Sequence, residues 1–195
     1  MKSTAKTSGC LEIVKCLRDD HAALLARVRE MRDPGGNLRE ALDAFAEASA
    51  PVLLAEEEVV LARALELEAL REAAMTALEE HALIEHLLER ARLSANEEQR
   101  FARLSVLADL TEHYLENAER VLFPRLRARL DESEREELGM RYREAKTHNE
   151  LAPVFQMPVR ETLLENQTGR IGYVIAWLLG VPAWVLLLIF LVRGH

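Results

Sequence analysis

Apolar residues recur at intervals of three and four along most of the chain, which is the spacing of amphipathic helices. No segment shows the alternation of apolar and polar residues that is typical of strands. The clearest turn is the Asp-Pro-Gly-Gly-Asn run at residues 33–37. The pattern predicts an all-α fold, an up-down four-helix bundle followed by a fifth helix. The predicted helices cover about residues 11–32, 38 to the high sixties, 71–93, 94–130 and 131–146.

Two of these helices begin with a capping signal, in which a short polar residue precedes a Glu by three positions. The second and fourth predicted helices also share a weak internal repeat, which relates residues 55–61 to residues 116–122. The capping pairs are Ser94 with Glu97 for the fourth helix, and Asp131 with Glu134, or Ser133 with Glu136, for the fifth.

The last apolar run, Ile171 to Val192, contains 22 residues and no charged side chain, and an arginine flanks each end. About 20 apolar residues are enough for a helix to cross the hydrocarbon core of a bilayer. We therefore predict a helical bundle at 1–146, a linker at 147–170 and a single-pass C-terminal membrane anchor at 171–192. Charged residues interrupt the apolar stretch near the N-terminus, which is not typical of an export signal, so we expect the bundle to be cytoplasmic.

The chain is acidic, with 33 Asp and Glu residues against 25 Lys and Arg, and its formal net charge is −8. This charge argues against nucleic acid as a partner, because phosphate groups are also negative. It favours a basic protein partner, and self-association into a homo-oligomer is a second expectation. The sequence contains no glycine-rich phosphate loop, nucleophile elbow or zinc-protease motif, so nothing in it predicts an enzyme.

Three metal-competent residues fall on the apolar faces of their helices when positions are placed about 100° apart. His21, Glu56 and His81 lie within the stripes of the first, second and third helices. An unpaired buried carboxylate is costly, so Glu56 is expected to have a partner. Two histidines and a carboxylate that converge in a bundle favour a metal site. The alternatives are ordinary core histidines and an ion pair between Glu56 and Arg63, which share one face.

Other candidates for this site lie on the third and fourth helices. Tyr114 lies within the apolar stripe of the fourth helix and is expected to bind a ferric ion, to hydrogen-bond a ligand or simply to pack. His113 lies at the edge of the same stripe, and Glu85 lies at the edge of the stripe of the third helix. Glu57 and Glu58 do not fall near the centre of the stripe of the second helix, and His86 lies well outside the stripe of the third helix and is predicted to point outward.

The order and spacing of these motifs resemble those of the hemerythrin-like (HHE) cation-binding family over about residues 11–130. The resemblance implies a non-haem, usually di-iron centre that binds dioxygen or serves iron, redox or nitric-oxide sensing. His21, Glu56, His81 and His113 match its ligand positions, and Glu85 matches a second ligand position on the third helix. The motifs are Asp20-His21, Ala55 to Glu58, Glu80 to Leu88, Glu112-His113 and Val121 to Leu126.

The sequence departs from this family at two positions. Val52 stands where a histidine is expected, and Asn117 and Ala118 stand where a carboxylate is expected. The expected cofactor is iron in a mononuclear or dinuclear site, with manganese or zinc as alternatives and a small diatomic molecule as the ligand. The other hypothesis is a metal-free bundle that acts as an interaction module tethered to a membrane.

Overall fold

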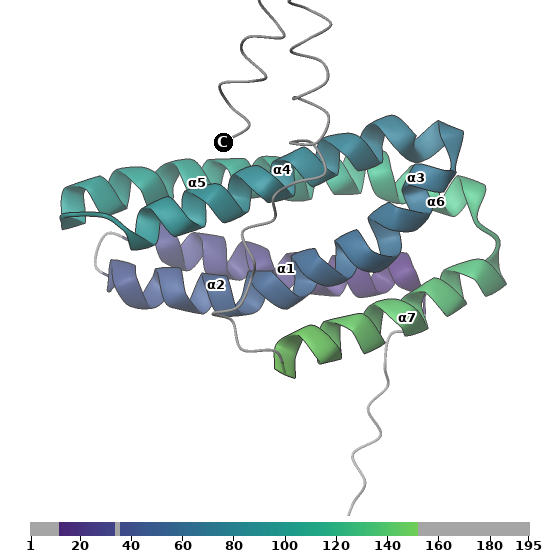
Figure 1. Ribbon diagram of the computed structural model, residues 1–195, viewed down its shortest axis with the longest axis horizontal. Coiled ribbons are helices and arrows are strands. Elements are labelled where there is room, and N and C mark those ends of the chain that lie inside the picture. Colours follow the sequence, from purple (N-terminus) through teal and green to yellow (C-terminus); the bar gives the residue numbers. More distant parts are fainter. Residues whose placement is uncertain (1–11, 34–35, 152–195) are drawn as a thin grey trace, which may run out of the picture. The chain divides into compact units, whose positions relative to one another are not determined.

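The computed structural model describes residues 12–33 and 36–151, and every structural statement below concerns these residues. They form helices and no strands, which confirms the all-α prediction for this part of the chain. Several helices continue into one another, so that there are five rods (Figure 1). The rods are α1 (Ile13–Met31); α2 (Leu38–Ala55) with η1 (Glu56–Leu61) and α3 (Ala62–Glu66); α4 (Glu68–Arg92); α5 (Glu97–Asn117) with η2 (Ala118–Leu122) and α6 (Phe123–Arg129); and α7 (Glu132–Leu151).

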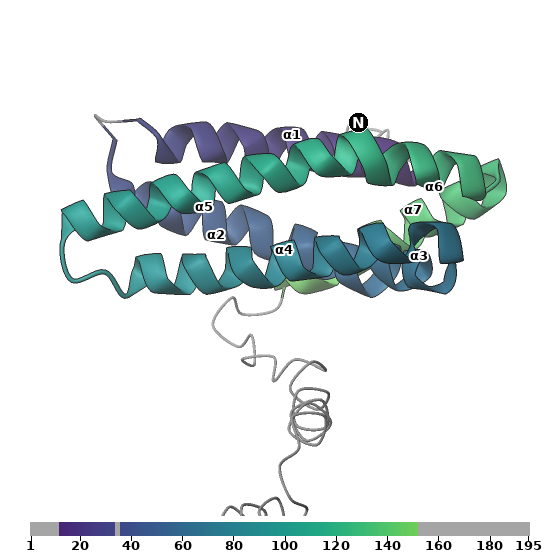
Figure 2. The ribbon, with the colours of Figure 1, turned by 90° about the horizontal axis from the view of Figure 1, so that it is seen from above.

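Four of the rods pack side by side around one core, and successive rods run in opposite directions (Figure 2). α1 lies against α2 and α5, while α4 lies against α2, α3 and α5. Apolar side chains such as Leu17, Phe45, Ile84 and Phe123 fill the space between them and are at most 1% exposed. Complete burial of a side chain of this kind contributes about 1.5–3 kcal/mol, so this core holds the rods together.

Side-chain caps explain where α2 and α7 begin. The side-chain oxygen of Asn37 accepts hydrogen bonds from the backbone N–H groups of Arg39 and Glu40 at the start of α2. Before α7, Asp131 Oδ1 accepts from the N–H of Glu134 at 2.9 Å, and Glu134 Oε2 accepts from the N–H of Asp131 at 2.9 Å. This reciprocal pair is a capping box, which confirms the first of the two pairs predicted for the fifth helix.

The predicted cap of the fourth helix is wrong. Asn96 precedes α5, and its Oδ1 accepts from the N–H of Gln99 at 2.8 Å. Gln99 Oε1 in turn accepts from the N–H of Ala95 at 3.0 Å. The capping motif is therefore shifted by two residues from Ser94, because the chain offers both a serine and an asparagine before the helix and Asn is at least as good a cap as Ser.

Two of the rods contain a π-helical segment, in which backbone hydrogen bonds span five residues instead of four. η1 and η2 are these segments. They fall within the two stretches that the internal repeat relates, and both end at the matched residues Leu61 and Leu122. The wider turn rotates successive side chains by less than 100°, so a regular helical wheel misplaces residues there. Such segments are common at functional sites.

α7 is attached to the bundle through polar contacts with Asp20 of α1. The hydroxyl of the fully buried Tyr142 donates to Asp20 Oδ2 at 2.8 Å, and Lys146 Nζ lies 2.6 Å from Asp20 Oδ1. α7 also packs against α2 and η1. It continues to Leu151, past its predicted end at Lys146, so the first residues of the predicted linker are helical.

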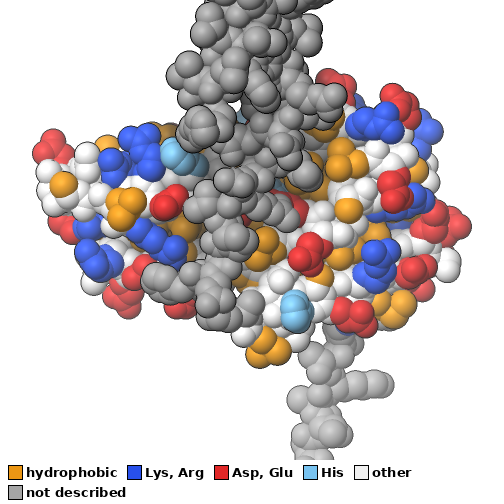
Figure 3. All heavy atoms as spheres, viewed as in Figure 1, with side chains coloured by type: hydrophobic (Ala, Val, Ile, Leu, Met, Phe, Trp, Pro, Cys, Tyr) orange, Lys and Arg blue, Asp and Glu red, His pale blue; other side chains and the backbone are white. Residues whose placement is uncertain are grey.

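The remainder of the predicted linker and the predicted transmembrane segment at 171–192 lie outside the described residues. Within the described ranges, no helix has both the length and the apolar character required to cross a bilayer. On the face seen in Figure 3, acidic and basic side chains are mixed with each other and with hydrophobic ones.

Candidate metal centre

Each of the four packed rods places one polar side chain in the same part of the core. None of the four is more than 4% exposed. Each lies on the apolar face of its helix, so the packing that buries this face also buries the polar group. These side chains, called the buried centre below, are His21 of α1, Glu56 of η1, His81 of α4 and Tyr114 of α5.

The Glu56 carboxylate is the hub of the buried centre. His21 Nε2 lies 2.8 Å from Glu56 Oε1, and the Tyr114 hydroxyl donates a hydrogen bond to Glu56 Oε2. His81 Nε2 lies 3.6 Å from Glu56 Oε2, which is too far for a hydrogen bond. The structure therefore brings together the three residues predicted to converge and Tyr114, one of the further candidates for this site.

His81 is held from its other side. Its Nδ1 lies 3.3 Å from Glu57 Oε1, whereas its Nε2 is buried and has no hydrogen-bond partner among the described residues. A histidine whose far nitrogen is bound by a carboxylate and whose near nitrogen is unpaired has the arrangement of a metal ligand. Glu57 was placed off the centre of the apolar stripe, yet only 7% of its side chain is exposed. Glu57 is the second residue of η1, where a regular wheel does not apply.

The pKa values within the buried centre follow from its burial and its charges. Burial opposes ionisation of Glu56, but the charge and hydrogen bond of His21, and then the charge of His81, outweigh it, so the pKa of Glu56 lies below its ordinary value. Burial, and then the charge of Glu56, raise the pKa of Tyr114 well above its ordinary value. Glu56 is therefore the anion of the buried centre, and Tyr114 remains a neutral donor.

Aromatic contacts fix the orientation of both histidine rings. The His21 ring centroid lies 5.5 Å from that of Tyr114 and 5.3 Å from that of Phe123. The His81 ring meets Tyr114 edge to face, with centroids 4.7 Å apart and an angle of 82° between the planes. Such aromatic packing restricts ring rotation, so the nitrogen atoms are positioned before any ligand arrives.

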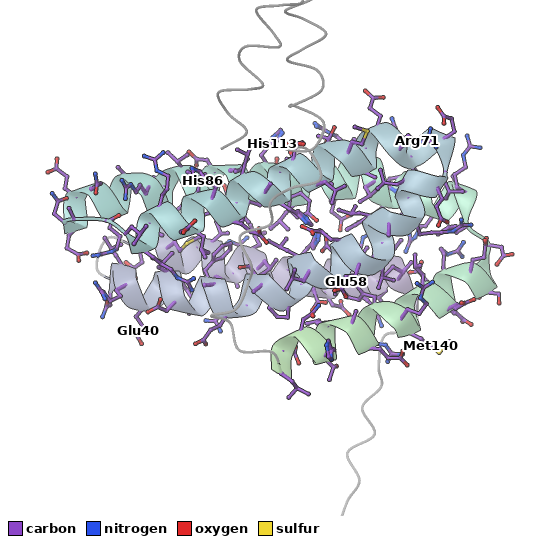
Figure 4. The ribbon with its side chains drawn as sticks, viewed as in Figure 1. Glu40, Glu58, Arg71, His86, His113 and Met140 are labelled. Atoms are coloured by element: carbon purple, nitrogen blue, oxygen red, sulfur yellow. The ribbon has the colours of Figure 1, made fainter. Side chains whose placement is uncertain are left out.

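The other predicted site residues, His113 and Glu85, are less buried than the four of the buried centre. The side chain of His113 is 65% exposed, and it points outward, as does His86 (Figure 4). Glu85 is half-buried on α4, one turn after His81. Burial raises the pKa of Glu85, and the charge of His81 partly opposes this shift.

Glu80 is a polar residue of this region that sequence analysis missed. It is 8% exposed, its Oε1 lies 3.5 Å from His113 Nε2, and its Oε2 is buried without a hydrogen-bond partner. Burial raises its pKa, and the charges of His113 and His81 partly oppose this shift. The spacing contained a signal, because Glu80 lies three residues after the buried Ala77 and four before the buried Ile84.

The alternative pairing of Glu56 with Arg63 is wrong. The Arg63 guanidinium lies 2.7 Å from Glu66 and 3.3 Å from Glu134. Both partners are on the outside of the molecule, and Arg63 links α3 to α7 there. Glu56 is instead satisfied entirely within the buried centre.

With Tyr114 bonded to Glu56, no group of three or more His, Cys, Asp or Glu side chains among the described residues is arranged as a ready metal site. The donor set nevertheless fits one. Ligand atoms lie about 2.0–2.2 Å from a metal and therefore ~3 Å from each other when the angle is near 90°. The separations of Glu56 from His21 and His81, 2.8 and 3.6 Å, lie around this value. Two histidines and one carboxylate are also the set that holds non-haem ferrous iron.

No family model matches the chain, and no curated protein or solved structure matches it significantly. The resemblance to hemerythrin-like proteins, and the cofactor that it implies, therefore stay predictions.

Proposed function

We propose that this protein binds a single metal ion, iron before manganese or zinc, through His21, Glu56 and His81 in a hemerythrin-like bundle. The observation that carries the proposal is His81 Nε2, which is buried, lacks a hydrogen-bond partner and faces the Glu56 carboxylate. A core nitrogen in this state costs free energy unless a ligand satisfies it. A bound cation would do so and would also balance the negative charge of Glu56.

Each side chain has a distinct task in this proposal. Glu56 supplies the negative charge, and Glu57 holds Nδ1 of His81 so that Nε2 faces the cation. Phe123 packs against His21 and keeps its ring in place. Iron with open coordination positions would bind a small diatomic ligand such as dioxygen or nitric oxide. The apolar residues around the buried centre would exclude bulk water from that ligand.

A mononuclear site is favoured over a dinuclear one. Val52 occupies the position of an expected second-metal histidine and is itself packed in the core, 3% exposed. His113 lies at the surface. These residues leave too few inward donors for a complete second set. We further propose, from its apolar sequence alone, that the segment Ile171 to Val192 tethers the bundle to a membrane and thereby determines where its metal chemistry occurs.

The test is the metal content of the full chain, purified in mild detergent without chelators and then loaded anaerobically with ferrous iron. Elemental mass spectrometry should find close to one metal ion per chain. His81→Ala should abolish binding, and His86→Ala, an exposed histidine on the same helix, should not. An absence of metal in the loaded wild-type protein, or equal losses in both variants, would refute the proposed site.

A second candidate function, a metal-free interaction module, has support from one observation. Tyr114 and His21 already occupy one oxygen each of Glu56, so the carboxylate is satisfied without a cation. The bundle would then bind a basic protein partner or another copy of itself at the membrane. Failure of the wild-type chain to take up metal under the conditions above would favour this function.

A further inference from the structure

A second polar pair lies between the buried centre and solvent. It consists of Glu80 on α4 and His113 on α5 and is called the uptake pair below. His113 Nε2 lies 3.5 Å from Glu80 Oε1, and α4 and α5 pack directly against each other. The side chain of His113 is 65% exposed, whereas that of Glu80 is 11% exposed. The pair therefore leads from open surface to a nearly buried carboxylate.

The inner end of the pair is adjacent to the buried centre. Glu80 directly precedes His81 in α4; the charge of His81 acts on Glu80, and the charge of Glu80 acts on Tyr114. Its Oε2 is buried and has no hydrogen-bond partner among the described residues, while Asn117 is within hydrogen-bonding reach of the same carboxylate. A buried carboxylate oxygen without a partner is costly, so a structure keeps one only where something offsets the cost.

We propose that His113 and Glu80 form an uptake site at which a divalent cation binds transiently before it passes to His81 and Glu56. This inference rests on the proposed metal-binding function and describes how that site is filled. His113 captures a hydrated cation at the surface through its imidazole. Glu80 then offers its unpaired oxygen, which exchanges water ligands for protein ligands on the way inward.

Two ligands suit a transient site better than a permanent one. Stable protein sites for these metals usually have three or four protein ligands, and a cation held by two leaves readily. A negative group also attracts cations and can raise their association rates by about 10–1,000-fold. The uptake pair should thus affect how fast the metal arrives rather than how tightly it is held.

Loss of an uptake residue and loss of a permanent ligand should change the rates of metal binding and release in different ways. An equilibrium constant does not depend on the path, so loss of an uptake residue must lower the association and dissociation rates by the same factor. The dissociation constant is then unchanged. Loss of a permanent ligand instead raises the dissociation rate and weakens binding.

The experiment uses Co²⁺ as the probe and the full chain in detergent, with loading followed by visible absorption in a stopped-flow instrument. Release is measured by trapping the ion with excess EDTA, and affinity by equilibrium titration. His113→Ala and Glu80→Gln should each slow loading and release about tenfold, with an unchanged dissociation constant. His86→Ala is the matched control, because it removes an exposed histidine of α4 and should leave both rates at the wild-type value.

Two results would overturn the proposal: wild-type rates in both variants, or weaker binding with faster release, which would make the pair permanent ligands. His113 is exposed, so its variant decides the matter even if Glu80→Gln unfolds. Failure of the proposed function looks different, because the wild-type chain itself would then bind no Co²⁺.

Discussion

Replacing Tyr114 with phenylalanine separates the metal-binding proposal from its metal-free alternative. The substitution removes one hydroxyl and retains the ring, which packs against both His21 and His81. That hydroxyl donates to Glu56 Oε2, and it therefore competes with a cation for the same oxygen. In our proposal the hydrogen bond must break, or at least weaken, when a metal binds.

The magnitude follows from the burial of the bond. Tyr114 and Glu56 are each 1% exposed, so water cannot replace the lost donor. A hydrogen bond to a charged group contributes about 1.5–3 kcal/mol, and the metal-free Tyr114→Phe protein should lose roughly this amount of its free energy of unfolding. The metal-bound protein should lose little. Because unfolding and metal binding form a thermodynamic cycle, the difference between these two losses appears as a gain in metal affinity of about 10–100-fold, since each 1.4 kcal/mol is a factor of ten.

The assay combines urea unfolding of the metal-free and Co²⁺-loaded proteins with equilibrium titration of Co²⁺ into each. The gain in binding free energy should equal the loss of metal-free stability within error. A lower affinity of the variant would refute this reasoning, because it would mean that Tyr114 is itself a ligand. An unchanged affinity together with a loss of stability would show that no metal reaches Glu56.

Three other perturbations test separate parts of the structure. Asp131→Ala should lower the free energy of unfolding by about 1 kcal/mol in urea, because the capping box of α7 is lost, and Ser133→Ala should have a smaller effect. The pKa of Glu56 is lower in the folded protein than in the unfolded chain, where it is near 4.5, so ionised Glu56 stabilises the fold above pH 4.5 and this contribution should be lost as the pH falls below that value. Glu56→Gln should therefore weaken the dependence of the free energy of unfolding on pH in this acid range. The same dependence in the variant and the wild-type protein would contradict the assignment. Deleting Glu58, an exposed residue of η1, should restore a regular helix, turn Glu57 away from His81 and reduce Co²⁺ binding, while circular dichroism remains helical.

Periodicity was enough to predict that two histidines enter the core on regular helices. His21 and His81 lie in uninterrupted stretches of α1 and α4, where 100° per residue holds, and both are buried as predicted. Glu56 was also placed correctly, because it is the first residue of η1 and the regular turns of α2 precede it. For these three residues the regular wheel was sufficient, although it missed Glu80 on α4.

Other features of the site and the fold were not determined by the sequence. Nothing in the sequence of η1 distinguishes a π-helical turn from an α-helical one, and Glu57 lies within that turn. The cap of α5 depends similarly on geometry, since Ser94 and Asn96 are both acceptable caps by type. The partner of Glu56 required knowledge of how four rods pack, because His21, His81 and Tyr114 come from three different helices.

The composition of the buried centre is itself an argument for function. A fully buried carboxylate has lost its hydration, and a core of this kind is often as stable, or more stable, when well-packed apolar residues replace such a group. Here polar residues from three rods surround the carboxylate that the fourth rod supplies, and Glu57 of the π-helical segment supplies a second carboxylate beside His81. Stability alone does not account for this arrangement, because the bundle already has an extensive apolar core. A cation that needs the charge of Glu56 and the unpaired nitrogen of His81 does account for it, which is why we place the function of the protein at this point in the bundle.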